Sequence, residues 1–424
     1  MQTSTTPIVY VPEDSDFTIY NLPYGVFETS SLDKRLGVAI GEYVLDLREA
    51  ATQGFLSSLS SEYFQGTDFN AIMGLDRRAW KALRSDIQDV VYGKTSESIK
   101  SHHSLLSKLF IPMHQVSMHL PAKIGDYTDF YSSKEHATNV GTMFRGADNA
   151  LNPNWVHLPV GYHGRSSSII ISGQDIRRPC GQLKGNQEPS PHYGPTQALD
   201  FELEMAFFVG QGNSLFESIP AKTARDYIFG LVLMNDWSAR DIQRWEYVPL
   251  GPFGAKNFAT SISPWIVPLE ALEPFRVPAP TQEPQVLEYL ERGPDPTTFD
   301  IHLTVSIQSS SMRKPQLICE SNFRYLYWTM EQQLAHHTVT GCNLRPGDLL
   351  ASGTISGKSE KSFGSMLELS WGGSKPLKLE ETQEQRVYLQ DGDQVMMHGY
   401  CQKENIRIGF GSCHGKILPA KPLT

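Results

Sequence analysis

Short apolar runs separated by turn residues dominate the beginning of the chain. Residues Gly37 to Ile40 and Tyr43 to Leu47 are two such runs, and Gly41 and Glu42 lie between them. Apolar runs bounded by a glycine turn are typical of paired strands. The pattern therefore predicts a small β-rich unit in this part of the chain.

Helical spacing replaces this pattern between about Phe69 and Phe110, where apolar residues recur among mixed charges. Residues Ile111 to Pro121 then form an apolar stretch closed by a proline, which is typical of a connector. We therefore predict a domain boundary near His119, with one domain at residues 1–118 and a second at residues 119–424.

Beyond this boundary the chain consists mainly of short apolar runs. The predicted strands are Ser168 to Ser172, Phe201 to Val209, Phe229 to Met234, Ile301 to Ile307, Leu367 to Trp371, Gln394 to Tyr400 and Arg407 to Phe410. The predicted helices are Ala221 to Ile228 and Tyr325 to His336. This ratio favours a mainly β fold of the α+β class, built as a β-roll or closed β architecture rather than as a doubly wound sheet. The proline-rich stretch from Pro274 to Pro296 is predicted to be a surface excursion.

The predicted strand at Phe201 to Val209 carries two glutamates in alternation with apolar residues. Strand periodicity places Glu202 and Glu204 on one face and residues such as Leu203 and Met205 on the other. Two carboxylates about 7 Å apart then point the same way, which suits a cation site. The same pattern also fits the solvated face of an amphipathic strand.

Two further carboxylates extend this hypothesis. Asp236 ends the apolar run from Phe229, where a predicted strand gives way to a helix, although aspartate is equally common as a helix N-cap. Asp129 follows the predicted domain boundary. With the two glutamates they would form an all-oxygen site, which suits a hard cation such as Ca²⁺, Mg²⁺ or Mn²⁺ better than zinc.

Candidate proton-transfer and cationic groups lie in loops by this interpretation. His136 follows Asp129 by seven residues in a polar, glycine-bounded segment, where it is either a general base beside a metal or a structural histidine. The pairs His102-His103 and His336-His337 lack metal-ligand spacing and are predicted to be structural, the second because it lies near a helical C-terminus. Lys256 lies in a Gly- and Pro-rich loop without the spacing of a phosphate-binding loop.

Composition narrows the class of protein. The chain has 424 residues, of which 40% are hydrophobic and 20% charged, as is typical of a chain folded throughout. Its formal net charge is -9, and no run of Lys or Arg marks a nucleic-acid or polybasic membrane surface. No stretch approaches the roughly 18 apolar residues of a membrane span, and the first residues lack a signal-peptide pattern. We expect neither nucleic acid nor membrane as a partner.

Five cysteines occur at wide spacing: Cys180, Cys319, Cys342, Cys401 and Cys413. An odd number without a C-x-x-C pair argues against a disulfide framework and against a zinc site. The expected location is therefore the cytoplasm. Motifs for zinc proteases, α/β-hydrolases and dinucleotide-binding enzymes are absent from the sequence, which disfavours those classes.

Long blocks of the sequence, in the same order, resemble the fumarylacetoacetate hydrolase family. The blocks are IGDYTDFYSSKEHATNVG from Ile124, LPVGYHGRSSS from Leu158, LDFELEMAFFVG from Leu199, LMNDWSARDIQRWEYVPLGPF from Leu233, GCNLRPGDLLASGTISG from Gly341 and GSMLELSW from Gly364. The resemblance runs from the N-terminal domain almost to the C-terminus. It implies a small SH3-like N-terminal β-barrel, a larger C-terminal β-roll and a homodimer.

The resemblance also implies a reaction and a set of site residues. The reaction is the hydrolysis of a carbon–carbon bond in a small β-diketo acid, fumarylacetoacetate, to fumarate and acetoacetate, the last step of tyrosine and phenylalanine catabolism. The implied metal ligands are Asp129, Glu202, Glu204 and Asp236, with a second Mg²⁺ site at Asp236, Lys256 and Thr260. The implied catalytic groups are His136 as base, Glu368 as the carboxylate that orients it, and Arg240, Gln243 and Lys256 as holders of the reacting oxygens. The implied substrate contacts are Tyr131, Arg145, Tyr162, Tyr247 and Thr354.

One departure from the family pattern lies around the lysine. The family has Gly-Lys-Ser-Phe-Gly-Thr, whereas this chain has alanines at Ala255 and Ala259 and an asparagine at Asn257. Two alternatives stay open. One is a related enzyme acting on keto acids, such as an acylpyruvate hydrolase, a hydratase or a decarboxylase. The other is a Ca²⁺-stabilised β-rich binding protein without catalysis, in which His136 and Glu368 would have no role.

Overall fold

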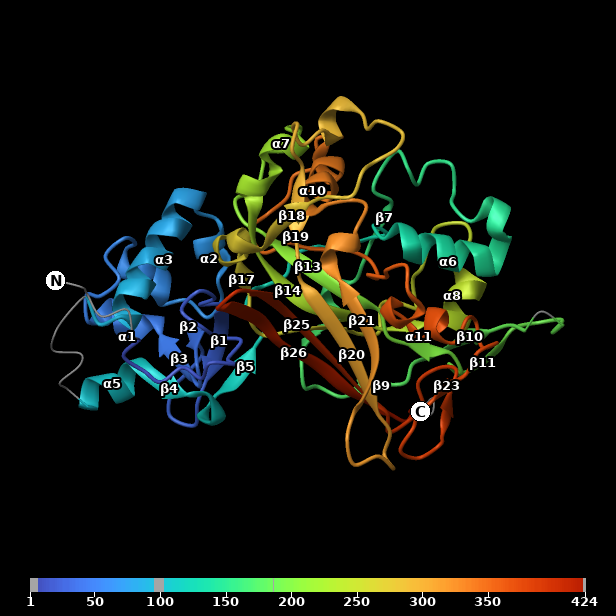
Figure 1. Cartoon of the computed structure of the whole chain (residues 1–424), viewed down its shortest axis with the longest axis horizontal. Coiled ribbons are helices and arrows are strands. Elements are labelled where there is room, and N and C mark those ends of the chain that lie inside the picture. Colours follow the sequence, from blue (N-terminus) through green and yellow to red (C-terminus); the bar gives the residue numbers. More distant parts are fainter. Residues whose placement is uncertain (1–6, 95–102, 186, 422–424) are drawn as a thin grey trace.

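A five-stranded antiparallel sheet forms the N-terminal part of the computed structural model, which describes residues 7–94, 103–185 and 187–421 (Figure 1). In the order β4-β3-β2-β1-β5 its strands are β4 (Phe110–Pro112), β3 (Tyr43–Asp46), β2 (Arg35–Ile40), β1 (Tyr24–Glu28) and β5 (Ser117–His119). The predicted strand pair around Gly41 is confirmed, since Ile40 pairs with Tyr43. Gly41 has φ +56°, a conformation that favours glycine.

Helices pack on this sheet. They are α1 (Leu47–Thr52), α2 (Asn70–Met73), α3 (Arg77–Val91) and α5 (His103–Leu109). α3 begins where the side chain of Asp76 accepts a hydrogen bond from Ala79 N at 2.9 Å, and it buries Trp80 and Leu83. The predicted helical region is thus confirmed for these residues, whereas His102 lies outside the described residues.

The prediction of a connector at Ile111 to Pro121 was wrong. β4 and β5 occupy much of it and form the two edges of the N-terminal sheet, through pairing with β3 and β1. Each strand has only three residues, too few to show an alternating pattern, so tertiary pairing defines them. The boundary predicted near His119 falls at the end of β5 and stays a prediction.

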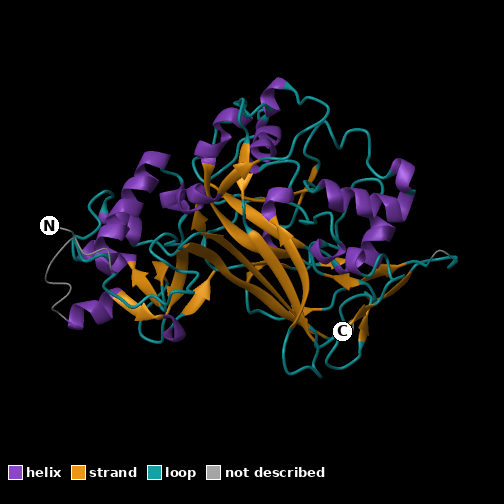
Figure 2. Ribbon diagram, viewed as in Figure 1, coloured by secondary structure: helices purple, strands orange, loops and turns teal. Residues whose placement is uncertain are grey.

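Two sheets form the centre of the remaining chain (Figure 2). The eight-stranded sheet consists of β7 (Gly161–His163), β6 (Tyr127–Phe130), β22 (Leu349–Ala351), β13 (Leu203–Val209), β14 (Ile228–Asp236), β16 (Thr260–Ile262) and β8 (Ile169–Ile171), with β17 (Val267–Pro268) paired to β14. The five-stranded sheet consists of β21 (Gln316–Asn322), β20 (His302–Gln308), β25 (Gln394–Lys403), β26 (Ile406–Leu418) and β9 (Ile176–Arg177). The fold therefore mixes α and β elements, and strands dominate its larger part, as predicted.

Short ribbons and helices surround these sheets. The two-stranded ribbons are β10 (Cys180–Leu183) with β11 (His192–Pro195), β12 (Leu199–Asp200) with β15 (Ser238–Ala239), β18 (Arg276–Pro278) with β19 (Thr297–Phe299), and β23 (Leu377–Lys378) with β24 (Gln385–Arg386). The helices are α6 (Lys134–Arg145), α7 (Ala221–Ala224), α8 (Arg240–Glu246), α9 (Leu269–Leu272), α10 (Met330–Thr338) and α11 (Met366–Leu369). Among the described residues, no helix has the length and apolar character needed to cross a lipid bilayer.

β13 is buried on both faces, which decides how its glutamates are used. Leu203 and Met205 belong to the core between the two large sheets. Ala206 and Phe208, on the opposite face, pack in a second core that includes Trp80 of the N-terminal part. The predicted alternation of faces is therefore confirmed, but the alternative of a solvated glutamate face was wrong, because Glu202 and Glu204 are only 5% and 0% exposed.

One strand prediction and one helix prediction need correction. Leu367 to Trp371 was predicted as a strand, whereas the structure has α11 there, because Ser365 accepts from Glu368 N and starts a helix. The helix predicted at Tyr325 to His336 begins later, at Met330, where Thr329 and Gln332 form a capping box.

Candidate active site and metal centre

Four carboxylates lie on one face of the large sheet. Asp129 pairs in register with Ala351, Ala351 with Ala206, and Glu204 with Met234, so side chains of Asp129 and Glu204 share a face. Asp236 ends β14 two residues after Met234, and its N–H donates to Glu202 O at 3.2 Å. The sheet therefore brings together Asp129, Glu202, Glu204 and Asp236, whose nearest carboxylate oxygens all lie within 4.8 Å of one another.

This acidic cluster is buried and under electrostatic strain. Glu204 and Asp236 are 0% exposed. Burial raises the pKa of Asp129 well above its ordinary value, and the charge of Asp236 raises it further. Burial likewise raises the pKa of Glu204, with added repulsion from Asp129 and Asp236. Among the described residues, Asp129 Oδ1 and Glu204 Oε1 have no hydrogen-bond partner. Buried oxygens without donors and with like charges around them fit a hard cation.

Two cations offset part of this charge at Glu202. Lys256 Nζ pairs with Glu202 Oε2 and, at 2.7 Å, with Asp236 Oδ2, while Arg240 Nη1 lies 2.7 Å from Glu202 Oε1. Burial would raise the pKa of Glu202, but Arg240 and Lys256 hold it well below its usual range. The pKa of Lys256 is in turn above its ordinary value, since Asp236 and Glu202 outweigh the opposing effect of burial.

Asp236 is the most heavily bonded member of the cluster. Thr260 Oγ1 donates to its Oδ1 at 2.7 Å, and Tyr162 OH donates to its Oδ2 at 3.0 Å. Ala255 and Ala259, where this chain departs from the family pattern, are both buried and neither has a positive φ. The predicted grouping of Asp236 with Lys256 and Thr260 is therefore present as contacts.

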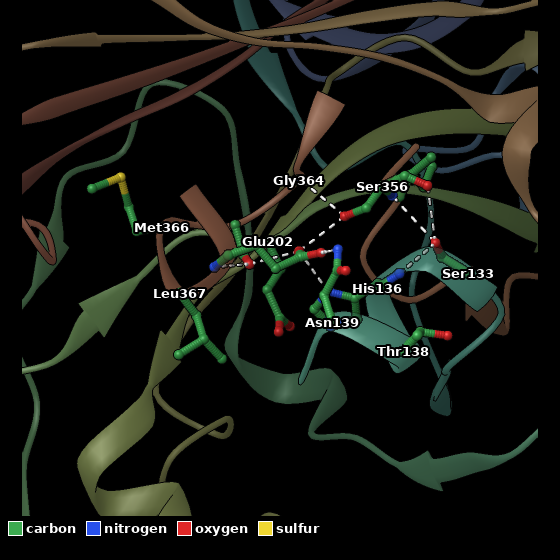
Figure 3. Close-up of polar contacts among 12 residues, drawn as sticks. Ser133, His136, Thr138, Asn139, Glu202, Ser356, Gly364, Met366 and Leu367 are labelled. Atoms are coloured by element: carbon green, nitrogen blue, oxygen red, sulfur yellow. Dashed lines mark hydrogen bonds and ion pairs between the residues drawn. The ribbon is translucent and has the colours of Figure 1, made fainter. Parts of the chain in front are cut away.

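His136 and Glu368 form a second buried feature. His136 Nδ1 lies 2.7 Å from Glu368 Oε2, and the two side chains are 4% and 0% exposed. Figure 3 shows the contacts around His136. The prediction that His136 lies in a loop was wrong: Ser133 caps α6, and His136 is in its first turn. Burial pushes the pKa of Glu368 upward, but the charge of His136 and several hydrogen-bond donors bring it below its ordinary value.

Some of the remaining predicted site residues contact His136 or Arg240, whereas others bond within a loop or are exposed. Tyr131 packs edge-on against His136 with ring centroids 5.4 Å apart, and Gln243 Oε1 lies 3.5 Å from Arg240 Nη1. Thr354 is buried. Arg145 ends α6 and donates to the carbonyls of its own loop, from Nε to Asn149 O and from Nη2 to Ala150 O. Tyr247, after α8, is 50% exposed.

Sequence reasoning missed several groups that hold this site. Asp200 Oδ2 accepts from Arg240 Nε at 2.8 Å, and its two oxygens also accept from the first two amides of α11. Asn139, Ser356 and Ser365 bond to Glu368. One signal was available, since Ser365 precedes Glu368 by three residues, the spacing of a helix N-cap motif. Asp200 and Asn139 carry no local signal, because their partners are remote in sequence.

A buried carboxylate cluster beside a hydrogen-bonded histidine and glutamate defines an enzyme site able to hold a divalent cation. Residues 126–418 match the family model described as fumarylacetoacetate (FAA) hydrolase C-terminal, and residues 20–121 match that described as fumarylacetoacetase N-terminal. The chain belongs to the fumarylacetoacetate hydrolase family.

Curated relatives extend over nearly the whole chain. It is 56% identical to the fumarylacetoacetase of Homo sapiens over 97% of this chain and 98% of that protein, and 54% identical to that of Dictyostelium discoideum over 97% of each.

Solved structures share the fold at low identity. A fumarylacetoacetate hydrolase from Exiguobacterium antarcticum has TM-score 0.51 and 16% identity over 94% of this chain and 100% of its own. A maleylpyruvate hydrolase from Sphingobium sp. SYK-6, in complex with manganese(II) and pyruvate, has TM-score 0.50 and 16% identity over 94% and 100%.

Proposed function

We propose that this protein hydrolyses a carbon–carbon bond of fumarylacetoacetate to give fumarate and acetoacetate, the last step of tyrosine and phenylalanine catabolism. The observation that carries the proposal is the buried carboxylate cluster beside the His136–Glu368 pair. Full-length similarity to curated fumarylacetoacetases selects this substrate among keto acids.

The proposed metal ligands are Asp129, Glu202, Glu204 and Asp236. A divalent cation bound there supplies Lewis acidity for the β-diketone of the substrate. The donor set is all oxygen, which favours Ca²⁺, Mg²⁺ or Mn²⁺; the Mn²⁺ complex of the maleylpyruvate hydrolase supports the last of these. Asp236, Thr260 and Lys256 are the proposed second site, in which Lys256 already neutralises part of the charge.

In the proposed reaction His136 is the general base. Glu368 accepts a hydrogen bond from Nδ1–H of His136. The unprotonated ring nitrogen is then Nε2, and its lone pair removes a proton from water. The resulting hydroxide attacks the carbonyl next to the fumaryl group. Collapse of the tetrahedral adduct breaks the carbon–carbon bond, and the acetoacetate enolate that leaves is then protonated.

Cationic groups with unused donors stabilise the negative oxygen of the adduct. Among the described residues, Arg240 Nη2 is buried without a hydrogen-bond partner. Lys256 has three N–H groups and uses two contacts, to Glu202 and Asp236. Arg240, Lys256 and Gln243 are the proposed contacts to this negative oxygen. Removing one buried donor that points at developing charge lowers the rate by about 10²- to 10³-fold.

Anion recognition accounts for how a protein of net charge -9 binds an acidic substrate. Arg240 of the proposed site also lines a cavity of about 590 Å³, whose other charged lining residues include Arg244, Lys184 and Asp241. Tyr131, Arg145, Tyr162, Tyr247 and Thr354 are the proposed substrate contacts.

The test is the loss of the β-diketone absorbance of fumarylacetoacetate, with and without chelator. Hydrolysis that stops on chelation and returns with Mg²⁺ or Ca²⁺ supports the proposal. Cleavage of acylpyruvates without cleavage of fumarylacetoacetate would instead favour the related hydrolase. Cation binding without turnover of either would favour the binding protein, for which the His136–Glu368 contact has no use.

The finer architecture is also proposed from the family. It comprises an SH3-like barrel at residues 1–118, a β-roll at residues 119–424, and a homodimer in the cytoplasm. Val248, Leu250 and Phe253 support the dimer, because they are 68%, 95% and 75% exposed on one loop. Light scattering of the wild type and of Leu250→Glu tests this assembly: a dimer that the charge dissociates is expected, and a monomeric wild type would contradict it.

A further inference from the structure

The two residues of the proposed dyad occupy equivalent positions in two helices. His136 is the third residue of α6, and Glu368 is the third residue of α11. A serine caps each helix: Ser133 Oγ accepts from His136 N at 3.2 Å, and Ser365 Oγ accepts from Glu368 N at 3.3 Å. Capping fixes where each helix begins, and so fixes the backbone from which each side chain projects.

Three neutral donors besides His136 surround the Glu368 carboxylate. Asn139 Nδ2 donates to Oε1 at 2.9 Å, and the hydroxyls of Ser356 and Ser365 donate to Oε2 at 2.9 Å each. Ser356 Oγ also accepts from Gly364 N at 2.9 Å, which leaves its hydrogen free to donate to Glu368. Asn139, Ser356 and His136 lie near one another in Figure 3. All these contacts favour the ionised carboxylate.

We propose that Asn139 is a positioning residue of the dyad, which acts with Ser356 to hold Glu368 as a fixed, ionised acceptor and thereby keeps the Nε2 lone pair of His136 available to water. This inference rests on the proposed function. Each of the four contacts favours the ionised form of Glu368, and an ionised carboxylate accepts a hydrogen bond from His136 Nδ1–H. The base nitrogen is then always Nε2.

Helix energetics indicate that Asn139 does not serve α6 itself. Asparagine has a lower helix propensity than leucine. Asn139 follows His136 by three residues, so the two side chains share one face of the helix and reach the same carboxylate. A residue that is unfavourable locally but bonded to a catalytic carboxylate has its reason in the site.

The first test uses the full-length protein with Mg²⁺ and compares Asn139→Leu with Thr138→Val. Leucine keeps the volume and removes the donor. Within the part of the chain that the structure describes, the Thr138 side chain bonds only to Lys134 O of the same helix, at 2.7 Å, and Thr138 is the matched control. We expect kcat of N139L to fall about tenfold, the effect of losing one hydrogen bond to a charged group, with KM within about twofold and Tm not lowered. T138V should retain wild-type kcat.

A charge test separates positioning from packing. Asn139→Asp places a second carboxylate against Glu368 Oε1, so the pair holds a shared proton at low pH and loses it as pH rises. The ratio of wild-type to N139D kcat should therefore decrease as pH is lowered, because the protonated aspartate can donate as asparagine does. Thr138→Asp adds the same charge one residue away and should not show this. Other titratable groups facing the dyad are Tyr131, Glu202 and Cys319.

An NMR titration of the His136 ring gives a readout that is independent of turnover. The added charge of N139D should move the titration of His136 to higher pH than T138D does. Equal shifts in both variants, or a kcat for N139L equal to that of the wild type, would overturn the positioning role. A wild type that does not cleave fumarylacetoacetate would overturn the proposed function instead, and the titration would still decide whether Asn139 acts on the dyad.

Discussion

The acidic cluster and the His136–Glu368 dyad are both buried sets of ionisable groups, yet their electrostatics are opposite. In the cluster, the pKa values of Asp129 and Glu204 are raised by burial and by neighbouring carboxylates. In the dyad, hydrogen-bond donors and His136 lower the pKa of Glu368 in spite of its burial. Burial alone therefore does not determine the charge state; the partners do.

The difference extends to hydrogen bonding. Among the described residues, the cluster has buried oxygens without partners at Asp129 and Glu204, whereas both oxygens of Glu368 accept hydrogen bonds. A region with missing positive charge is suited to bind a cation, and a region whose bonds are complete is suited to direct a proton. The two regions thus divide the proposed chemistry between them.

The largest expected effect is on the dyad. His136→Ala should lower kcat by about 10² to 10⁴ while bound metal stays nearly stoichiometric, because a positioned proton-transfer group is removed and no carboxylate is touched. The measurements are kcat and metal content of the same preparation. Loss of metal together with His136 would show that the two regions are not separate.

A double-mutant cycle sharpens this result. Glu368→Gln should also lower kcat, and the double variant should be little worse than His136→Ala alone, because both residues serve one proton transfer. Additive losses in log kcat would contradict the dyad.

The second effect concerns the cluster. Glu204→Gln should weaken the divalent cation by roughly tenfold or more and lower activity, which excess metal partly restores; Glu202→Gln should do the same. In metal-free protein, however, Glu204→Gln should raise Tm, because it removes one of several repelling buried charges. Calorimetry with and without chelator tests both signs. Full activity of the wild type after exhaustive metal stripping would contradict the cation site.

The sequence predicted much of this arrangement through short-range patterns. Strand alternation placed Glu202 and Glu204 together, and the strand end at Asp236 was correct. The burial of these groups could not be predicted, since the residues around them, such as Asp129 and Lys256, come from segments remote in sequence. The local hydrophobic pattern of a strand does not indicate which remote segment packs on each of its faces.

The dyad could be predicted only through the family resemblance. By local pattern Glu368 fell in a predicted strand and His136 in a loop, although each follows a serine by three residues and starts a helix. Asn139 and Asp200 could not be found at all, because their functions depend on partners 229 and 40 residues away. A serine three residues before a polar residue is therefore a signal for the start of a helix.

A smaller effect is expected outside both regions, at Arg145. Arg145→Lys keeps the charge but loses the planar fork that binds a carboxylate with two parallel hydrogen bonds, so KM should rise several-fold with little change in kcat. Steady-state kinetics with fumarylacetoacetate provides the measurement. Since Arg145 also bonds to Asn149 O and Ala150 O, Tm serves as the control for a loosened loop. An unchanged KM would remove Arg145 from the substrate site.

The smallest effect is a pH dependence that separates cluster from dyad by sign. Asp129 and Glu204 have folded-state pKa values above their unfolded values, so in metal-free protein the folded state binds more protons and stability falls as pH rises through that window. Glu368 has the opposite shift, so its contribution is present above its unfolded pKa and is lost as pH falls.

A bound cation cancels the repulsion in the cluster and requires its carboxylates to be deprotonated. The increase in Tm on adding Mg²⁺ should therefore grow by a few degrees from pH 5.5 to pH 8 in the wild type. In Glu204→Gln this Mg²⁺-dependent increase in Tm should grow less with pH than in the wild type. In Glu368→Gln it should grow as much as in the wild type, because that substitution leaves the cluster intact. Melting curves of the three proteins at the two pH values test this, and an equal increase at both pH values in the wild type would show that the cluster does not hold the ion.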